Sequence, residues 1–381
     1  MNARKDIGEV IGGRYEIKEV ITHRDRKMSV YVATDIQTQE EVALKLNTAE
    51  HRVRLETEFY DDSIRDLEGF PSKRWSWEHG CYCLGAIALD RLGPSLDTVI
   101  KEVDESKFSL KTTLQIMDQV ITRIQALHGR HIVHRGIKPD NFCIGLKGSK
   151  TENKVYMIDF DLSKKYIKDG VHIRDYGDNV GNTFWMSLAI HKGYEPVRRD
   201  DMESAGFLAI YLLKGGLPWF CEGRSSAIMR GSTLIALPKR ISRLISFSEA
   251  ITALQELCKD LPEEIITYIT YCRSLQFAQE PDYGYCRELF RQVFKREGFK
   301  DDGLCDWSTP ELVTESESME IAHGSDDDLP SSNHSEQDGS ATPFDDDTVD
   351  GQTLVVDHTK TTEACTAQYL DLRTRQVLRL I

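Results

Sequence analysis

The N-terminal part of the chain alternates apolar and polar residues with a period of two. Three segments with this pattern are separated by polar turns: RYEIKEVI (14–21), SVYVATDI (29–36) and EEVALKL (40–46). A period of two predicts strands that bury one face, so we expect three strands of one sheet here. A further apolar run, YCLGAIAL (82–89), predicts a short buried strand.

Helical spacing of apolar residues dominates the rest of the chain. The segment 52–67 places Leu55, Phe59 and Ile64 near helical spacing. A longer helix is predicted at 110–128, with an apolar stripe formed by Leu114, Met117, Ile121, Ile124 and Leu127. Three further helices are expected: 201–213, apolar nearly all round as in a lobe centre, and the amphipathic 248–258 and 262–275. A small β-rich half before a larger helical half predicts an α+β, two-lobed fold.

The net charge of −14 is concentrated near the C-terminus. Residues 311–350 hold 13 acidic side chains and no Lys or Arg, so the remaining chain is close to neutral. That balance argues against nucleic-acid binding. The segment SDDDLPSSNHSEQDGSATPFDDD (325–347) has almost no apolar content and cannot offset its ordering entropy. We therefore predict that residues 308–360 are disordered. The end, YLDLRTRQVLRLI (369–381), is apolar and basic, and it fits either a docking helix or a partly ordered tail.

Other features bound the class of protein. No run of 18 apolar residues occurs, so we expect no membrane-spanning helix, and the N-terminus lacks a secretory pattern. The nine cysteines include no Cys-x-x-Cys pair, which favours reduced thiols over a zinc site. We therefore expect a cytoplasmic or nuclear protein, a monomer, with protein partners and no membrane partner.

A series of short motifs runs along the chain in a fixed order. They are VALK (42–45), LGPSLDTVI (92–100), HRGIKPDN (134–141), MIDFDL (157–162), RRDDMES (198–204), LPWF (217–220) and CRSLQFAQEPDYGYCRELF (272–290). One such motif is weak, but the ordered series is specific, and residues 8–307 resemble a protein kinase of the casein kinase I family. The resemblance implies a kinase domain with an N-lobe at about 14–91 and a C-lobe at about 92–307, before a tail at 308–381.

The resemblance also implies a site for ATP and Mg²⁺. Lys45 matches the strand lysine that contacts the α- and β-phosphates, and Glu56 matches its helix partner, with Glu58 as the alternative. Asp159 matches the aspartate that binds Mg²⁺, and Asn141 matches the asparagine that binds a second metal ion. A second interpretation of Lys45 and Asp159 is a structural ion pair with no nucleotide.

Further site residues are implied in the same way. Lys138 matches the lysine that contacts the γ-phosphate. Val30 and Ala43 would cover the adenine from above, Leu92 would follow the hinge, and Cys143 would form the adenine floor in place of a larger apolar residue. Asp201 matches the aspartate that holds the backbone of the catalytic loop, which is a structural role.

Three departures from the family pattern count against catalysis. His134-Arg135-Gly136 stands where His-Arg-Asp is usual, so the side chain that accepts or orients the substrate proton is missing. Asp140 is near in sequence, but in the family its position is variable and is expected to point elsewhere.

The other two departures concern glycines. No glycine occurs in ITHRDRKMSVYV (21–32), where a phosphate-binding loop is expected. His23, Arg24, Arg26 and Lys27 bring positive charge, so either side chains meet the phosphates or the segment is a solvated hairpin. Asp161 replaces the glycine of Asp-Phe-Gly, and it would either repel Asp159 or strengthen a metal site.

Substrate recognition also differs from the family. In GNTFWMSLAI (181–190), Phe184 takes the place of a basic residue, and the stretch 220–232 retains only Arg224 and Arg230. The leading hypothesis is a pseudokinase that binds ATP without efficient turnover and acts as a scaffold or regulator. The alternative is a slow serine/threonine kinase, because positioning and electrostatics carry much of phosphoryl transfer. A third hypothesis makes the acidic tail an interaction arm, and its alternative is a solubilising tail.

Overall fold

The computed structural model describes residues 3–24, 27–78, 85–168, 170–173, 182–219 and 254–308. The chain divides into two units, Met1–Ser325 and Asp326–Ile381, and the second lies wholly outside the described residues. The acidic tail from residue 309, its basic end and most of the helix expected at 248–258 also fall outside them.

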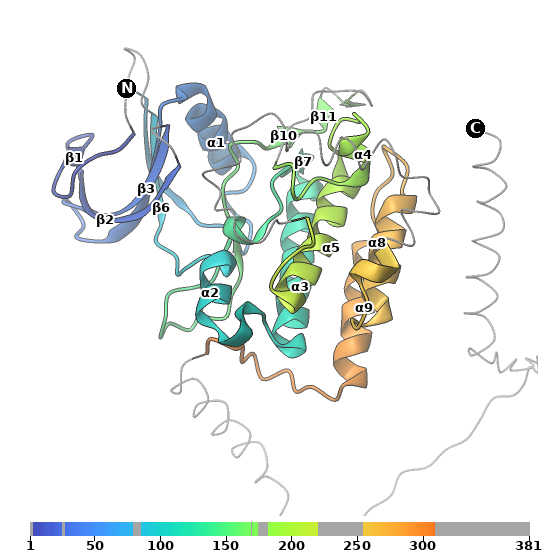
Figure 1. The fold of residues 1–381 in the computed structure, drawn as a ribbon. Coiled ribbons are helices and arrows are strands. Elements are labelled where there is room, and N and C mark those ends of the chain that lie inside the picture. The colour runs from blue at the N-terminus through green and yellow to red at the C-terminus, as the bar shows by residue number, and fades with distance from the viewer. Residues whose placement is uncertain are drawn as a thin grey trace, which may run out of the picture. The chain divides into compact units, whose positions relative to one another are not determined.

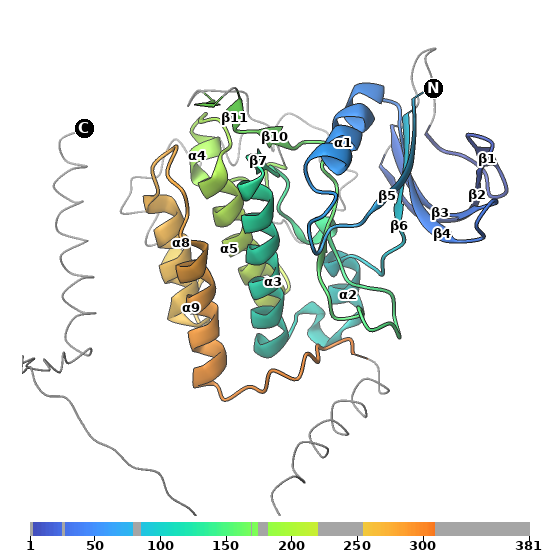
Figure 2. The ribbon, with the colours of Figure 1, turned by 180° about the vertical axis from the view of Figure 1, so that it is seen from behind.

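The N-terminal lobe is built on one antiparallel sheet (Figures 1 and 2). Its strands are β1 (Val10–Ile11), β2 (Tyr15–Arg24), β3 (Met28–Asp35), β4 (Glu41–Asn47), β5 (Lys73–Glu78) and β6 (Gly85–Asp90), in the order β1-β2-β3-β4-β6-β5. The three alternating segments and the described part of the apolar run, residues 85–89, therefore form strands as predicted. The sequence reasoning missed the two edge strands, β1 and β5. β1 is only two residues long, and β5 alternates tryptophans with polar residues.

The register of the sheet separates its two faces. Lys45 lies opposite Val30 on β3 and Ile87 on β6, so these three side chains share a face. Alternate positions such as Tyr31 and Leu44 point to the other face. Those positions form a core of their own with the N-terminal segment, while Ile87 joins the core of the C-terminal lobe.

Helix α1 (Glu50–Asp62) packs on the Lys45 face of the sheet. The sequence placed Leu55, Phe59 and Ile64 near helical spacing; Phe59 and Ile64 are buried, but only Phe59 is a buried residue of the helix. Leu55 is 41% exposed, and Ile64 lies beyond the end of the helix. The helix instead buries Val53, Phe59 and Tyr60 together with the carboxylate of Glu56, because its inner face meets both apolar side chains and an ammonium group.

The C-terminal lobe is mainly helical. Its helices are α2 (Leu96–Glu102), α3 (Leu110–Gly129), α4 (Leu188–His191), α5 (Arg198–Lys214), α8 (Glu263–Ser274) and α9 (Tyr283–Arg296), with 3₁₀ turns at Asp104–Ser106 and Pro139–Asn141. Two-residue strands pair in the loops between them: β7 (Ile132–Val133) with β10 (Lys164–Lys165), β8 (Phe142–Cys143) with β9 (Tyr156–Met157), and β11 (Ile167–Lys168) with β12 (Val171–His172).

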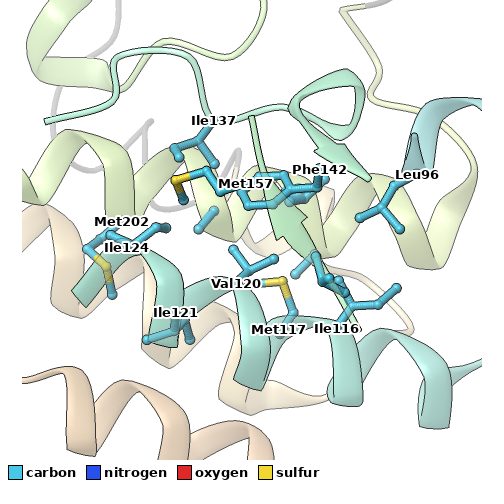
Figure 3. Packing of buried hydrophobic residues seen from close by; sticks show 14 of the residues in the cluster. Leu96, Ile116, Met117, Val120, Ile121, Ile124, Ile137, Phe142, Met157 and Met202 are labelled. Atoms are coloured by element: carbon cyan, nitrogen blue, oxygen red, sulfur yellow. The ribbon is translucent and has the colours of Figure 1, made fainter. Parts of the chain in front are cut away.

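The core of this lobe lies around α3. All five residues of its predicted stripe are buried, and α5 is buried along most of its length, as predicted. Figure 3 shows Ile116, Met117, Val120 and Ile124 of α3 below Ile137, Phe142 and Met157, which come from the loop segments above the helix. This packing fixes 134–143 and 156–161 on a rigid base.

Candidate functional site

Lys45 is the centre of a buried ion-pair cluster. Its Nζ lies 2.7 Å from Glu56 Oε2 and 2.5 Å from Asp159 Oδ1, so it joins strand β4 to helix α1 and to the segment after β9. Glu58, the alternative partner, is 58% exposed and faces Arg54 on the outer side of the helix. Of the two candidate carboxylates, Glu56 is thus the one that contacts Lys45.

The pKa values of Lys45 and Glu56 are both shifted in this cluster. Burial alone would lower the pKa of Lys45, but the carboxylates of Asp159 and Glu56 outweigh it and hold that pKa above its ordinary value. Burial raises the pKa of Glu56 to about 7, and Asp159 adds to this while Lys45 opposes it. Both pKa values are raised, which favours the charged form of Lys45 and the neutral form of Glu56. We take the lysine as charged, because two carboxylates lie within 2.7 Å of its ammonium group.

Asn141 and Asp159 flank a short ladder. Phe142 of β8 pairs with Met157 of β9, and the Ile158 N–H donates to the Asn141 carbonyl at 3.0 Å, so Asn141 lies beside the residue that precedes Asp159. Asn141 Nδ2 donates to the Gly136 carbonyl at 2.8 Å, which leaves its Oδ1 as the oxygen that can bind a cation.

The donor set at this point is oxygen, which suits Mg²⁺. Among the described residues, no group of three or more His, Cys, Asp or Glu side chains is arranged to hold a metal ion. A Mg²⁺ ion bound by Asp159 and Asn141 would therefore take its other ligands from water or from phosphate oxygens, as Mg²⁺ commonly does.

Asp201, at the start of α5, holds the loop that precedes Asn141. Its carboxylate accepts hydrogen bonds from the backbone N–H of His134 at 2.7 Å and of Arg135 at 2.9 Å, and it contacts His128 Nε2 at 3.1 Å. Burial would raise the pKa of Asp201, but these hydrogen bonds lower it overall. The loop is thus held rigidly, with Arg135 at a left-handed φ of 63°.

Gly136 lies within this held loop and carries no side chain. A Cβ added there would lie 3.1 Å from Asn141 Nδ2 and 3.2 Å from His134 Nδ1, and φ of Gly136 is not positive. The backbone therefore suits a non-glycine residue after small adjustments. Asp140 is 43% exposed and lies 3.3 Å from the Nζ of Lys138, so its carboxylate faces a lysine of the same loop.

The residues expected around the adenine are half-buried. Val30 and Ala43 lie on the sheet face of Lys45, and Leu92 follows the end of β6. Cys143 of β8 is buried, and burial raises the pKa of its thiol to about 12. A Cβ on Gly93 would lie 2.2 Å from the Gly145 carbonyl oxygen, so only glycine allows the connection between the lobes to run this close to β8.

The described part of the segment without glycines lies on the paired strands β2 and β3, with a register shift between Val20 and Thr22. β2 and β3 stay paired as far as Arg24 and Met28, and residues 25–26 lie outside the described chain. His23 Nδ1 contacts Ser29 Oγ at 2.8 Å, and its ring packs edge-on against Tyr31 at 5.6 Å. His23 thus points to the sheet face opposite Lys45, which supports the solvated-hairpin interpretation for this residue.

Two contacts of α1 were missed by the sequence reasoning. Arg52 Nη1 lies 3.2 Å from Asp161 Oδ2, and Tyr60 packs edge-on against the buried Phe160 with ring centroids 5.4 Å apart. Arg52, Glu56 and Tyr60 are spaced by four residues and therefore share one helix face, which is the sequence signal that could have found them. From the sequence, we expected Asp161 either to repel Asp159 or to strengthen a metal site. The structure shows a third arrangement, in which the Asp161 carboxylate pairs with Arg52.

Phe184 is half-buried and packs against the core of the C-terminal lobe, and its carbonyl accepts a hydrogen bond from Trp219 Nε1 at 2.9 Å. The stretch 220–232, with Arg224 and Arg230, lies outside the described residues.

No helix of the described residues is long and apolar enough to cross a membrane.

A comparison with protein families matches residues 87–276 to the protein kinase domain. The match starts within β6 and includes Asn141, Asp159 and Asp201. Lys45 and Glu56 precede it, but the fold joins them to Asp159 by the ion pairs above. Protein kinase domains generally use ATP and Mg²⁺ and act on protein substrates. The chain therefore contains a protein kinase domain, with a β-rich N-terminal lobe and a helical C-terminal lobe.

Proposed function

We propose that this chain is a catalytically impaired protein kinase of the casein kinase I type, which retains a nucleotide-binding site and acts as a scaffold or regulator of partner proteins. The observation that carries the proposal is Gly136. The loop around it is held by Asp201 and Asn141, yet the position of the usual catalytic aspartate has no side chain. A general base contributes about 10²–10⁴-fold in rate, so we expect its loss to leave no efficient turnover.

The retained residues fit nucleotide binding. Lys45 would contact the α- and β-phosphates, and Lys138 would contact the γ-phosphate. Asp159 and Asn141 would hold Mg²⁺, while Val30, Ala43 and Leu92 would surround the adenine. Bound Mg-ATP would supply the phosphoryl group and the metal charge that neutralises it. Because Lys45 already contacts Glu56, its ammonium group needs little rearrangement to meet a phosphate.

Asp140 is a poor substitute for the missing aspartate. Its carboxylate lies 3.3 Å from Lys138, so a proton transfer to Asp140 would weaken this ion pair. The second candidate function, a slow serine/threonine kinase, is favoured by the assembled contacts of Lys45 with Glu56 and Asp159. Positioning and electrostatic stabilisation can sustain some transfer without a base.

The first experiment compares the wild-type protein with Gly136→Asp and Lys45→Met. Transfer of labelled phosphate from Mg-ATP to casein and to the protein itself is measured, together with the shift of the melting temperature on adding Mg-ATP. Because position 136 accepts a Cβ with small adjustments, Gly136→Asp should fold. We expect no transfer by wild type above the Lys45→Met background, a melting shift in wild type, and transfer raised at least about 100-fold in Gly136→Asp.

Each outcome separates the candidates. Transfer by wild type above the Lys45→Met background, raised further by Gly136→Asp, would replace the pseudokinase with a weakened kinase. Wild-type transfer that Gly136→Asp leaves unchanged would indicate a kinase that works without this base. If Mg-ATP does not shift the melting temperature of wild type, the protein does not bind the nucleotide. Only the scaffold role would then remain.

Location and partners remain predictions. The cysteine pattern favours a reducing compartment, so we place the protein in the cytoplasm or nucleus as a monomer with protein partners. Among the described residues, Cys143, Cys258, Cys272, Cys286 and Cys305 are free thiols, which is compatible with that proposal.

A further inference from the structure

The aspartate in place of the motif glycine contacts helix α1. Asp161 and Asp159 are two residues apart, but their carboxylates reach different cations. Asp159 contacts Lys45 on β4, whereas Asp161 contacts Arg52 on α1 at 3.2 Å. The Asp161 side chain is 13% exposed and the Arg52 side chain 44%. The ion pair is thus partly shielded from water, and the Asp161 carboxylate faces the helix.

One face of α1 meets the segment 159–161 over three successive turns. Arg52 contacts the Asp161 carboxylate, Glu56 Oε1 accepts a hydrogen bond from the Phe160 N–H at 3.2 Å, and Tyr60 packs on the Phe160 ring. A glycine at 161 would leave the second and third contacts and remove the first. The first turn of the helix would then lose its contact with this segment.

The first turn of α1 has no side-chain cap. Its N-cap residue is Ala49, which makes no side-chain hydrogen bond to the helix. A cation in the first turn is also unfavourable next to the helix dipole, so Arg52 by itself weakens the N-terminus. The carboxylate of Asp161 offsets that charge at the first turn.

We propose that Asp161 is a positioning residue: through Arg52 it holds helix α1 against the segment 159–161, so that the Lys45–Glu56 ion pair is assembled before any nucleotide binds. A kinase domain with glycine at this position has no side chain for this contact. The proposal concerns the nucleotide-free protein, so it stands or falls independently of whether the chain binds ATP.

The test is hydrogen–deuterium exchange of residues 50–62 in the full-length protein without nucleotide. The variants are Asp161→Asn, Arg52→Gln and the double variant, since Asp161→Asn keeps the size of the side chain and both substitutions remove a charge. A partly exposed ion pair has a modest effect, so exchange in 50–62 should become about two- to fivefold faster in each single variant. The double variant should exchange no faster than the singles, because both remove the same contact.

Three controls make the result specific. Arg54→Gln removes an exposed arginine of the same helix that faces Glu58 on the outer side, and it should leave exchange unchanged. Arg52→Lys keeps the charge and should stay close to wild type. Residues 110–129 of α3 should exchange equally in all variants, which excludes a general loss of stability. Removing Arg52 also takes a positive charge away from the positive end of the helix dipole. That effect alone would stabilise the helix and slow exchange, so it cannot account for faster exchange in Arg52→Gln.

Two results would overturn the proposal. Wild-type exchange rates in 50–62 for both Asp161→Asn and Arg52→Gln would show that the ion pair does not hold the helix. Effects that add in the double variant would show that the two side chains act separately.

Discussion

At the residue scale, a single buried carboxylate organises the catalytic loop. Asp201 is 3% exposed and accepts hydrogen bonds from two backbone N–H groups of His134 and Arg135. Those N–H groups point inward and have few other possible partners. These contacts are with the loop backbone, so they form although position 136 is glycine.

We expect Asp201→Asn to destabilise the protein by about 2–3 kcal/mol at neutral pH, because the amide presents a donor where both carboxylate oxygens accept. The folded pKa of Asp201 is lowered below its ordinary value near 3.8, so its stabilisation is present above about pH 4 and is lost as pH falls further. Urea unfolding of wild type and Asp201→Asn should give a constant difference in the free energy of unfolding between pH 7 and pH 4. At pH 3.5 this difference should be smaller. A difference that stays constant to the lowest pH would contradict this role.

At the scale of elements, the packing of α5 against α8 depends on a glycine. A Cβ on Gly206 of α5 would lie 2.6 Å from Ile269 Cγ1 and 3.1 Å from Tyr268 Cε1. Both neighbours are fully buried, so neither can move freely. Glycine costs helix stability, but here it sets how closely the two helices approach.

Gly206→Ala should therefore destabilise the protein by up to about 2 kcal/mol. Overpacking costs about 1–3 kcal/mol, and it outweighs the gain of about 1 kcal/mol from replacing a helical glycine. Gly284→Ala in α9 is the matched control, because its added Cβ would meet only Asp282 Oδ1, at 3.3 Å. That variant should be as stable as wild type or more so. Chemical denaturation measures both, and equal gains for the two variants would contradict a tight α5–α8 contact.

At the scale of the whole molecule, the end of the described chain returns to the start of α3. Asp306 accepts hydrogen bonds from Ser109 N and Thr112 Oγ1, and Trp307 packs on Phe108. Ser308, which the sequence assigned to the tail, contacts Asn153 through its hydroxyl at 3.1 Å. A truncation that tests the acidic segment should therefore begin after residue 308.

Deleting residues 309–381 should leave the melting temperature of the kinase domain unchanged, because residues 299–308 and their contacts with α3 are kept. If the acidic segment is an interaction arm, the shortened protein should capture fewer partners in pull-downs than the full-length chain. An unchanged set of partners would leave the solubilising-tail interpretation.

The sequence alone determined the plan of the fold and the identity of the motif residues. Period-two alternation in β2–β4 and helical periodicity in α3 are local properties, so they can be read without knowing the neighbours of each element. The absence of a side chain at Gly136 is also a fact of sequence. The structure adds to it a loop whose backbone is held in place around the missing group.

Only the tertiary structure decided which charges meet. Glu56 and Glu58 are equally acidic in sequence, and the helix face turned toward β4 selects Glu56. Leu55 fits an apolar pattern but lies on the exposed side, because the inner face of α1 must bind Lys45 and Asp161 as well as bury apolar groups. The Arg52–Asp161 contact joins residues 109 positions apart. The four-residue spacing of Arg52, Glu56 and Tyr60 places Arg52 on the inner helix face. It does not identify Asp161 as the partner, because that contact forms only when the helix and the segment 159–161 pack together.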